Sequence, residues 1–121
     1  MKKLLFGHKY VWNIIGGEKK ISIRRAMEGK HNFFKGEAVL AMFQGGMAVM
    51  LRMTANTERK IFCELTDMEA REDGYENVED AFIQLRTEHY ATLTKEDQIA
   101  ILRFQVYDVD GVPVVSTGNS L

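Results

Sequence analysis

The sequence holds a single cysteine, Cys63. One thiol excludes an intrachain disulfide and a Cys-x-x-Cys pair for zinc or redox chemistry. Cys63 stands within residues 60–65, a stretch that we expect to form a strand, and nothing nearby in sequence supplies a base to form its thiolate. We therefore interpret Cys63 as a small apolar residue rather than a nucleophile.

Histidine is also scarce. The three histidines, His8, His31 and His89, are scattered along the chain without the spacing of metal ligands. The sequence therefore predicts neither a metal site nor a cofactor.

Long hydrophobic runs are absent, and no run approaches the roughly 20 apolar residues of a membrane-spanning helix. Residues 1–6 resemble the charged opening of a signal peptide, but Gly7-His8-Lys9 interrupts the apolar part after three residues. We expect a soluble cytoplasmic protein with no membrane partner. Its 121 residues, 45% apolar and 27% charged, suit one compact domain and leave no room for a second.

The net charge of −1 hides a separation of charge along the chain. Residues 17–35 hold six Lys or Arg against two Glu, whereas residues 64–80 hold eight acids against Arg71 alone. Tight, sequence-blind binding of duplex DNA would need the basic stretch without the acidic one, so it is not favoured.

Residues 19–25 form the most distinctive stretch. Lys20, Ser22 and Arg24 alternate with two isoleucines, which is the period of a half-buried strand. Four of these seven residues are cationic and none is acidic, which favours an anionic or electron-rich ligand. The alternative interpretation is a charged edge strand that resists aggregation.

Local patterns predict the remaining elements of the first half. An apolar stripe predicts a short helix over residues 8–15, which Gly16-Gly17 ends. Residues 26–36 lack a period and predict a loop, whose Phe33 and Phe34 form a lid or a plug beneath it. Two runs apolar on both faces, 38–43 and 47–53, predict a hairpin of strands covered on each side.

In the second half, Thr66 and Glu69 have capping-box spacing and predict a helix that stops at Gly74. A second helix starts at Asn77, and its apolar stripe continues to Leu93, interrupted by His89, which we interpret as an interior histidine. Residues 98–107 alternate as a long central strand. Asp110-Gly111 predicts a type I′ hairpin turn, and Pro113 confines the strand that follows it to an edge of the sheet. We expect residues 116–121 to form a loose tail.

Helices placed between antiparallel strands in so short a chain predict an α+β domain. The strands that are apolar on both faces predict a small, mostly antiparallel barrel, closed or partly closed, with helices on its rim.

Five short motifs, in order, resemble those of the ASCH domain, a PUA-like β-barrel. They are Gly-x-Lys-x-Ile-Ser-Ile-Arg at residues 17–24, Phe34-Lys35-Gly36-Glu37, Leu65-Thr66-Asp67 with Ala70 and Glu72-Asp73-Gly74, Tyr90, and Ile101-Leu102-Arg103-Phe104. The resemblance implies one ASCH domain over residues 1–121, with its core at about 10–107 and a C-terminal hairpin at about 106–116.

Within that superfamily the length and the Lys-x-Ile-Ser-Ile-Arg form are most similar to small bacterial amidohydrolases that deacetylate N4-acetylcytidine. Their lysine, threonine and glutamate fall on Lys19, Ser22 and Asp73. Serine keeps the hydroxyl of threonine, whereas aspartate shortens the reach of the carboxylate by about one methylene.

The resemblance implies catalytic roles for these three residues. Ser22 would be the nucleophile, Lys19 the proton acceptor, and Asp73 the group that orients Lys19 or a water. Arg24 would bind a phosphate, a carbonyl or the oxyanion. Strict alternation instead puts Lys20 on the face of Ser22, so Lys19 reaches the site only if the strand begins after it or contains a bulge.

The alternative function is a non-catalytic module that binds RNA or a modified nucleotide. In it Lys20, Arg24 and Arg25 would hold phosphates, while Phe33, Phe34 or Tyr90 would contact a base. A third reading is a regulatory domain with an unrelated ligand. The expected partner is therefore a small nucleoside or RNA, and no obligate protein partner is inferred.

Overall fold

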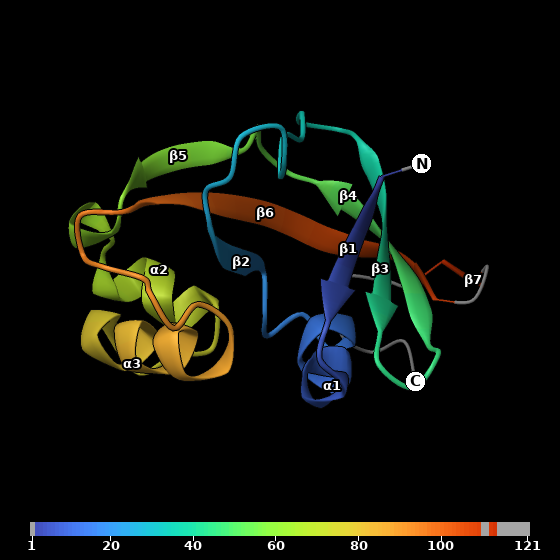
Figure 1. Cartoon of the computed structure of the whole chain (residues 1–121). Coiled ribbons are helices and arrows are strands. Elements are labelled where there is room, and N and C mark those ends of the chain that lie inside the picture. Colours follow the sequence, from blue (N-terminus) through green and yellow to red (C-terminus); the bar gives the residue numbers. More distant parts are fainter. Residues whose placement is uncertain (1, 110–111, 114–121) are drawn as a thin grey trace.

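The computed structural model describes residues 2–109 and 112–113. In this part of the chain a seven-stranded mixed sheet curls into a half-barrel with a few helices (Figure 1). The strand order is β1-β3-β4-β6-β2, and β5 and β7 also pair with β6. The strands are β1 (Lys3–Phe6), β2 (Ile21–Arg25), β3 (Ala38–Phe43), β4 (Ala48–Met53), β5 (Glu58–Ile61), β6 (Gln98–Val109) and β7 (Val112–Pro113).

β6 is the centre of the sheet, as the alternation over residues 98–107 predicts. Its first half pairs antiparallel with β2 and β5, and its second half pairs antiparallel with β4. The β4–β6 register shifts between Met50 and Leu51, and such an irregularity bends a sheet. This long strand therefore joins the two halves of the molecule.

The helices are η1 (His8–Tyr10), α1 (Val11–Ile15), η2 (Phe62–Glu64), α2 (Asp67–Glu72) and α3 (Val78–Glu88). Thr66 and Asn77 cap α2 and α3 as predicted, since their side chains accept the backbone N–H groups of Glu69 and Asp80. No helix in the described part of the chain is long and apolar enough to cross a membrane.

Several predicted boundaries were wrong. The strand expected at 60–65 lies at Glu58–Ile61, and Cys63 is exposed in η2. α3 ends at Glu88, so His89 is its C-cap rather than an interior histidine, and Leu93 is buried from the loop beyond. β1 was not predicted. The predicted turn at 110–111 and the tail at 116–121 lie outside the described residues.

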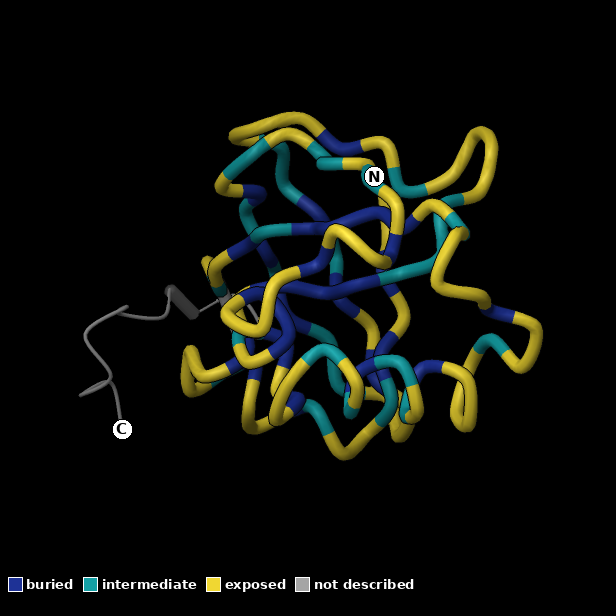
Figure 2. Tube along the Cα trace, turned by 90° about the vertical axis from the view of Figure 1, so that its left-hand side faces the viewer, coloured by how far each residue is buried: buried dark blue, intermediate teal, exposed yellow. Residues whose placement is uncertain are grey.

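The core has two parts, one on each face of β6. Ala100, Leu102 and Phe104 point into a cluster with β1, β3 and β4, whereas Ile99 and Ile101 point into a cluster with α2 and α3. In Figure 2 the segments that cross the middle of the molecule are buried and most connecting loops are exposed. β6 therefore buries side chains on both of its faces.

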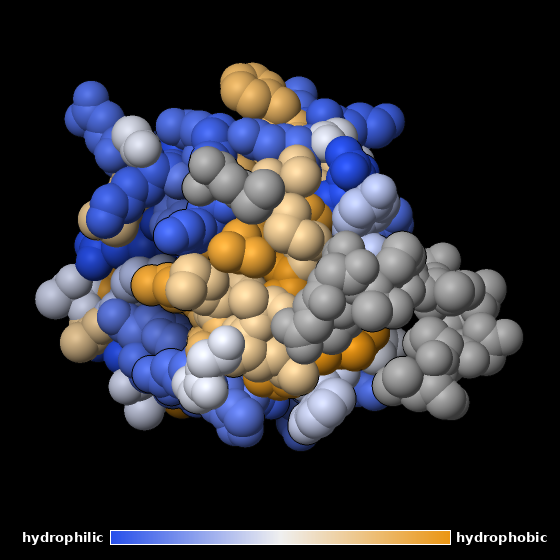
Figure 3. Space-filling model, turned by 90° about the vertical axis from the view of Figure 1, so that its right-hand side faces the viewer, coloured by the Kyte–Doolittle hydropathy of each residue, from blue (hydrophilic) through white to orange (hydrophobic). Residues whose placement is uncertain are grey.

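β3 and β4, in contrast, bury one face only, which corrects the expectation that both faces are covered. Alternate residues such as Val39, Ala41 and Leu51 are buried, while Met42 on the other face is exposed. Apolar side chains gather on the side of the molecule where β3 and β4 lie (Figure 3). The curled sheet therefore lacks an outer layer over these strands in the described part of the chain.

Candidate functional site

A cavity of about 100 Å³ opens at the seam between β1 and β2, the two ends of the strand order. Arg24 bridges this seam, because its Nη2 donates to the carbonyl oxygen of Leu5 at 2.8 Å. Four parts of the sequence line the cavity: the end of β1 with η1, the start of β2 with Lys19 before it, the residues that follow α2, and α3 with the segment after it. The lining side chains include Phe6, Tyr10, Lys19, Ser22, Arg24, Asp73, His89 and Tyr90.

Lys19 and Asp73 form an ion pair in this cavity, and they are only 5% and 4% exposed. Lys19 Nζ also donates to the Asp73 carbonyl oxygen at 3.3 Å. The second carboxylate oxygen of Asp73 accepts the backbone N–H of Ile23 at 2.8 Å. Asp73 is therefore fixed from both sides, and its shorter side chain does reach the lysine.

Lys19 reaches the cavity because it precedes the strand. β2 begins at Ile21, so the alternation of the strand does not govern Lys19. Its backbone N–H donates to the Asn13 carbonyl oxygen at 2.9 Å, after a reversal at Gly17, whose φ is +80°. Lys20 is exposed and does not line the cavity.

Burial lowers the pKa of Lys19 to about 7, and the positive charge of Arg24 acts in the same direction. The Asp73 carboxylate favours the charged ammonium and opposes this shift. A lysine whose pKa lies so close to neutrality can exchange a proton with a substrate near pH 7.

Ser22 and Arg24 share one face of β2, as the alternation predicts. That face is not solvated, however, because Ser22 is only 5% exposed at the cavity wall. Arg24 Nε donates to Ser22 Oγ at 3.0 Å, and the guanidinium stacks on Phe6 with Cζ 4.9 Å from the ring centroid. These two contacts hold the guanidinium beside the hydroxyl.

Tyr10 and His89 line the cavity, although neither was predicted as a site residue: Tyr10 belongs to the apolar stripe of the helix expected over residues 8–15, and His89 interrupts the stripe of the second helix. The Tyr10 ring centroid is 5.1 Å from Lys19 Nζ, and its hydroxyl donates to Glu88 at 3.4 Å. Burial raises the pKa of Tyr10 and lowers that of His89. Apolar periodicity cannot distinguish a ring packed in a core from a ring that lines a pocket, so no sequence signal identified them.

The other predicted ligand residues are divided by the structure. Tyr90 lines the cavity with Arg24. Arg25 points away from it and binds Thr92 and Asp97, Phe33 belongs to the core, and Phe34 is exposed in the loop after β2. These last three residues and Lys20 therefore do not share the site of Lys19 and Ser22.

A wider groove of about 830 Å³ adjoins the cavity and shares five lining residues with it. η1 and the end of α3 approach one another across this groove, where Lys9 binds both carboxylate oxygens of Glu88 at 2.7 and 2.8 Å. The cavity can hold a group of a few atoms, and the groove can hold a larger part of the same ligand.

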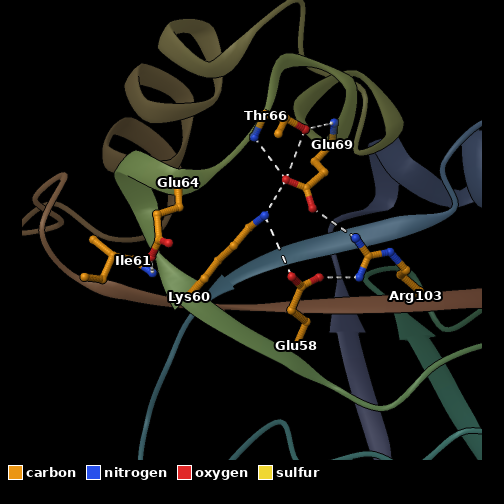
Figure 4. A network of polar contacts seen from close by, with 7 residues as sticks. All are labelled: Glu58, Lys60, Ile61, Glu64, Thr66, Glu69 and Arg103. Carbon is orange, nitrogen blue, oxygen red and sulfur yellow. Dashed lines mark hydrogen bonds and ion pairs between the residues drawn. The ribbon is translucent and has the colours of Figure 1, made fainter.

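A network of charged side chains holds α2 on the sheet (Figure 4). Glu69 in α2 accepts from Lys60 of β5 at 2.7 Å and from Arg103 of β6 at 3.0 Å. Glu58 binds Arg103 at 2.7 Å from the other side. Because Asp73 is the C-cap of α2, this network sets the position of its carboxylate.

No three His, Cys, Asp or Glu side chains within residues 2–109 and 112–113 gather as metal ligands would.

No protein-family model matches the sequence, and no curated protein matches it. Solved structures do match its fold. A DUF984-family protein from Enterococcus faecalis has a TM-score of 0.69 and 12% identity, covering 89% of this chain and 80% of its own. The hypothetical protein PH0355 has a TM-score of 0.62 and 21% identity, covering 88% and 99%. An ASCH domain from Lactobacillus crispatus has a TM-score of 0.62 and 14% identity, covering 78% and 67%.

At these identities the comparisons establish the fold alone. The chain has an ASCH-like α+β fold, which confirms the fold class expected from its motifs.

Proposed function

We propose that this protein is a small amidohydrolase that removes the acyl group from an acylated nucleoside such as N4-acetylcytidine. The observation that carries the proposal is the convergence of Lys19, Ser22 and Asp73 in one buried cavity, with Arg24 bound to the serine hydroxyl. Nucleophile, base and a donor for negative charge are the groups that amide hydrolysis needs.

In the proposed mechanism the acyl carbonyl enters the cavity and Ser22 Oγ attacks its carbon. The neutral amine of Lys19 takes the serine proton, and Arg24 stabilises the negative charge on the former carbonyl oxygen. The C–N bond breaks as Lys19 returns the proton to the leaving N4 amine. A water then attacks the acyl-Ser22 ester, again with Lys19 as base, and releases the carboxylic acid and free Ser22. Asp73 orients Lys19 throughout.

The two hollows suggest how the substrate is divided. A volume of about 100 Å³ suits an acetyl group, whereas the base and sugar need the adjoining groove of about 830 Å³. We therefore expect short acyl groups to be preferred to branched or aromatic ones.

The direct test follows the deacetylation of N4-acetylcytidine by mass with purified protein. Turnover should be lost in Ser22→Ala and in Lys19→Ala, and it should persist in Lys95→Ala, which removes an exposed lysine that does not line the cavity. No turnover by folded wild-type protein would exclude the proposal. Turnover that survives in Lys19→Ala but is lost in Lys20→Ala would transfer the role to Lys20.

The lysine variants need a control for folding, because Lys19→Ala leaves the buried Asp73 carboxylate without its cation. Circular dichroism of each variant provides this control for folding. Trapping of an acetyl group on Ser22, detected by mass after rapid acid quench, tests the nucleophile without any lysine variant.

A second candidate function is the binding of an acylated or otherwise modified nucleotide without hydrolysis. The contacts of Arg24 favour it, because Nε already donates to Ser22 Oγ and Nη2 to the Leu5 carbonyl oxygen, which leaves only part of the guanidinium to bind an oxyanion. Saturable binding of N4-acetylcytidine by calorimetry, with no product after prolonged incubation, would select this function.

A further inference from the structure

A second hollow, of about 460 Å³, lies near the opposite end of β1 from the catalytic cavity. Lys2 and Lys3 form one wall at the start of β1, and the loop residues 29–33 form the other. The two hollows share no lining residue, so this one is a separate place for a ligand.

The lining of this hollow is cationic. It includes three lysines, Lys2, Lys3 and Lys30, and no carboxylate. Lys2 binds Glu37 at 3.1 Å. Within the part of the chain that the structure describes, Lys3 and Lys30 make no side-chain hydrogen bond or ion pair. Two ammonium groups therefore face the solvent without a counter-charge.

The wall that carries Lys30 is held in place. Arg59 donates to the Lys30 carbonyl oxygen at 2.8 Å and to Asn32 at 2.9 Å, and Thr57 donates to the His31 carbonyl oxygen at 2.7 Å. His31 itself has a φ of +60°, the left-handed conformation that such outside contacts must sustain. A loop fixed in this way loses little entropy when a ligand binds.

Phe34 follows directly on this loop and is 66% exposed. Lys2 Nζ lies 5.5 Å from its ring centroid. A large aromatic ring that is open to solvent beside a cation is the usual platform on which single-stranded nucleic acids stack a base.

Burial lowers the pKa of His31 to about 4, and the cationic side chains of Arg24, Lys30 and Arg59 act in the same direction.

From these contacts we infer that the hollow binds the phosphates of a single-stranded polynucleotide, with Lys3 and Lys30 on the phosphates and Phe34 under a base. The overall charge of −1 makes the attraction local to this hollow rather than general to the surface. That the strand is RNA, presented to the catalytic cavity, rests on the proposed function; the phosphate site itself rests only on these residues.

The test is fluorescence anisotropy of a labelled ten-nucleotide single-stranded oligoribonucleotide at several salt concentrations. Replacing two phosphate-binding cations should reduce the salt slope by roughly 1.4, at about 0.7 per contact on a single strand. The Lys3→Gln/Lys30→Gln variant should therefore bind at least about tenfold more weakly at low salt, and Phe34→Ala should lose about fivefold or more.

The control variant, Arg71→Gln/Lys95→Gln, removes the same charge from two exposed positions in or near the acidic half of the chain. It should bind like wild type. Equal weakening by both double variants, no saturable binding by the wild type at 50 mM salt, or equal competition by a polyglutamate peptide of the same charge would overturn the inference.

Turnover separates this inference from the proposed function. Lys3→Gln/Lys30→Gln should hydrolyse free N4-acetylcytidine as the wild type does, because neither residue lines the cavity. Oligonucleotide binding without any turnover would support the phosphate site and overturn the proposed amidohydrolase activity. Turnover without oligonucleotide binding would support the amidohydrolase activity and overturn the phosphate site.

Discussion

The Lys19–Asp73 pair removes two charges almost completely from water. The desolvation of such a pair can exceed its Coulombic gain, so a buried ion pair is weak evidence for a stabilising role. A lysine with a lowered pKa that lines the same cavity as a serine is better evidence for a role in catalysis.

The pKa of Lys19 predicts the pH dependence of activity. A base must be neutral, and burial lowers this pKa from 10.5 to about 7, so kcat/KM should rise with pH through about 7. Asp73→Asn removes the charge that favours the ammonium, so the rising limb should move to lower pH. Kinetics from pH 5 to 9 measure both profiles. A flat profile in this range would contradict the assignment of Lys19 as base.

The same pair predicts a stability effect. Lys19→Met should destabilise the fold by about 3–5 kcal/mol, because it leaves the carboxylate buried and unpaired. Between pH 7 and 10.5 the unfolded chain binds more protons at Lys19 than the folded chain does, so the stability of wild type relative to Lys19→Met should increase as pH rises through this window. Urea unfolding of both proteins at pH 7 and 9 measures the difference in their free energies of unfolding. A smaller advantage of the wild type at pH 9 than at pH 7 would contradict the lowered pKa of Lys19.

At the scale of elements, α2 is too short to be stable as an isolated helix and depends on its contacts with the rest of the fold. It has six residues, a cap at Thr66 and the anchoring of Glu69 on two strands. Since Asp73 is the C-cap of α2, loss of the N-cap at Thr66 should disturb the cavity as well.

Thr66→Ala should cost about 1 kcal/mol of stability through loss of the cap and should also lower turnover. Asn77→Ala is the matched control, because it removes the cap of α3, at the end remote from His89. It should cost similar stability with little loss of turnover. Urea unfolding and the deacetylation assay measure the two effects, and a parallel loss of turnover in both variants would show that α2 has no special role.

At the scale of the molecule, β1 lies at one end of the strand order. It has four residues, pairs only with β3 among the described strands, and meets β2 through the Arg24 side chain instead of a ladder. β6, in contrast, pairs on both sides and is buried on both faces over its first half.

Hydrogen exchange should therefore be faster in β1 than in β4 and β6, because local opening costs less where fewer contacts are broken. A ligand in the cavity should slow the exchange of β1 amides more than that of β4. Mass-detected exchange of peptic fragments measures this. Equal protection of β1 and β6 in the free protein would contradict this view of the seam.

Local rules predicted much of the molecule. The alternation of β6, the hairpin of β3 and β4, and both helix caps depend on neighbouring residues, which act through backbone geometry and side-chain periodicity. β1 escaped prediction because Leu5, on its outer side, is exposed and breaks the polar and apolar alternation that marks a strand.

The sequence by itself determined the fold class, the order of most elements and the shared face of Ser22 and Arg24, since these follow from periods of two and 3.6 residues. Only the tertiary structure decided between Lys19 and Lys20, brought Asp73 within reach of Lys19, and separated Arg25, Phe33 and Phe34 from the cavity. Those outcomes depend on where β2 begins and on how α2 packs against it, across 54 residues of chain, and no local pattern encodes the distance between two segments that meet only in the folded protein.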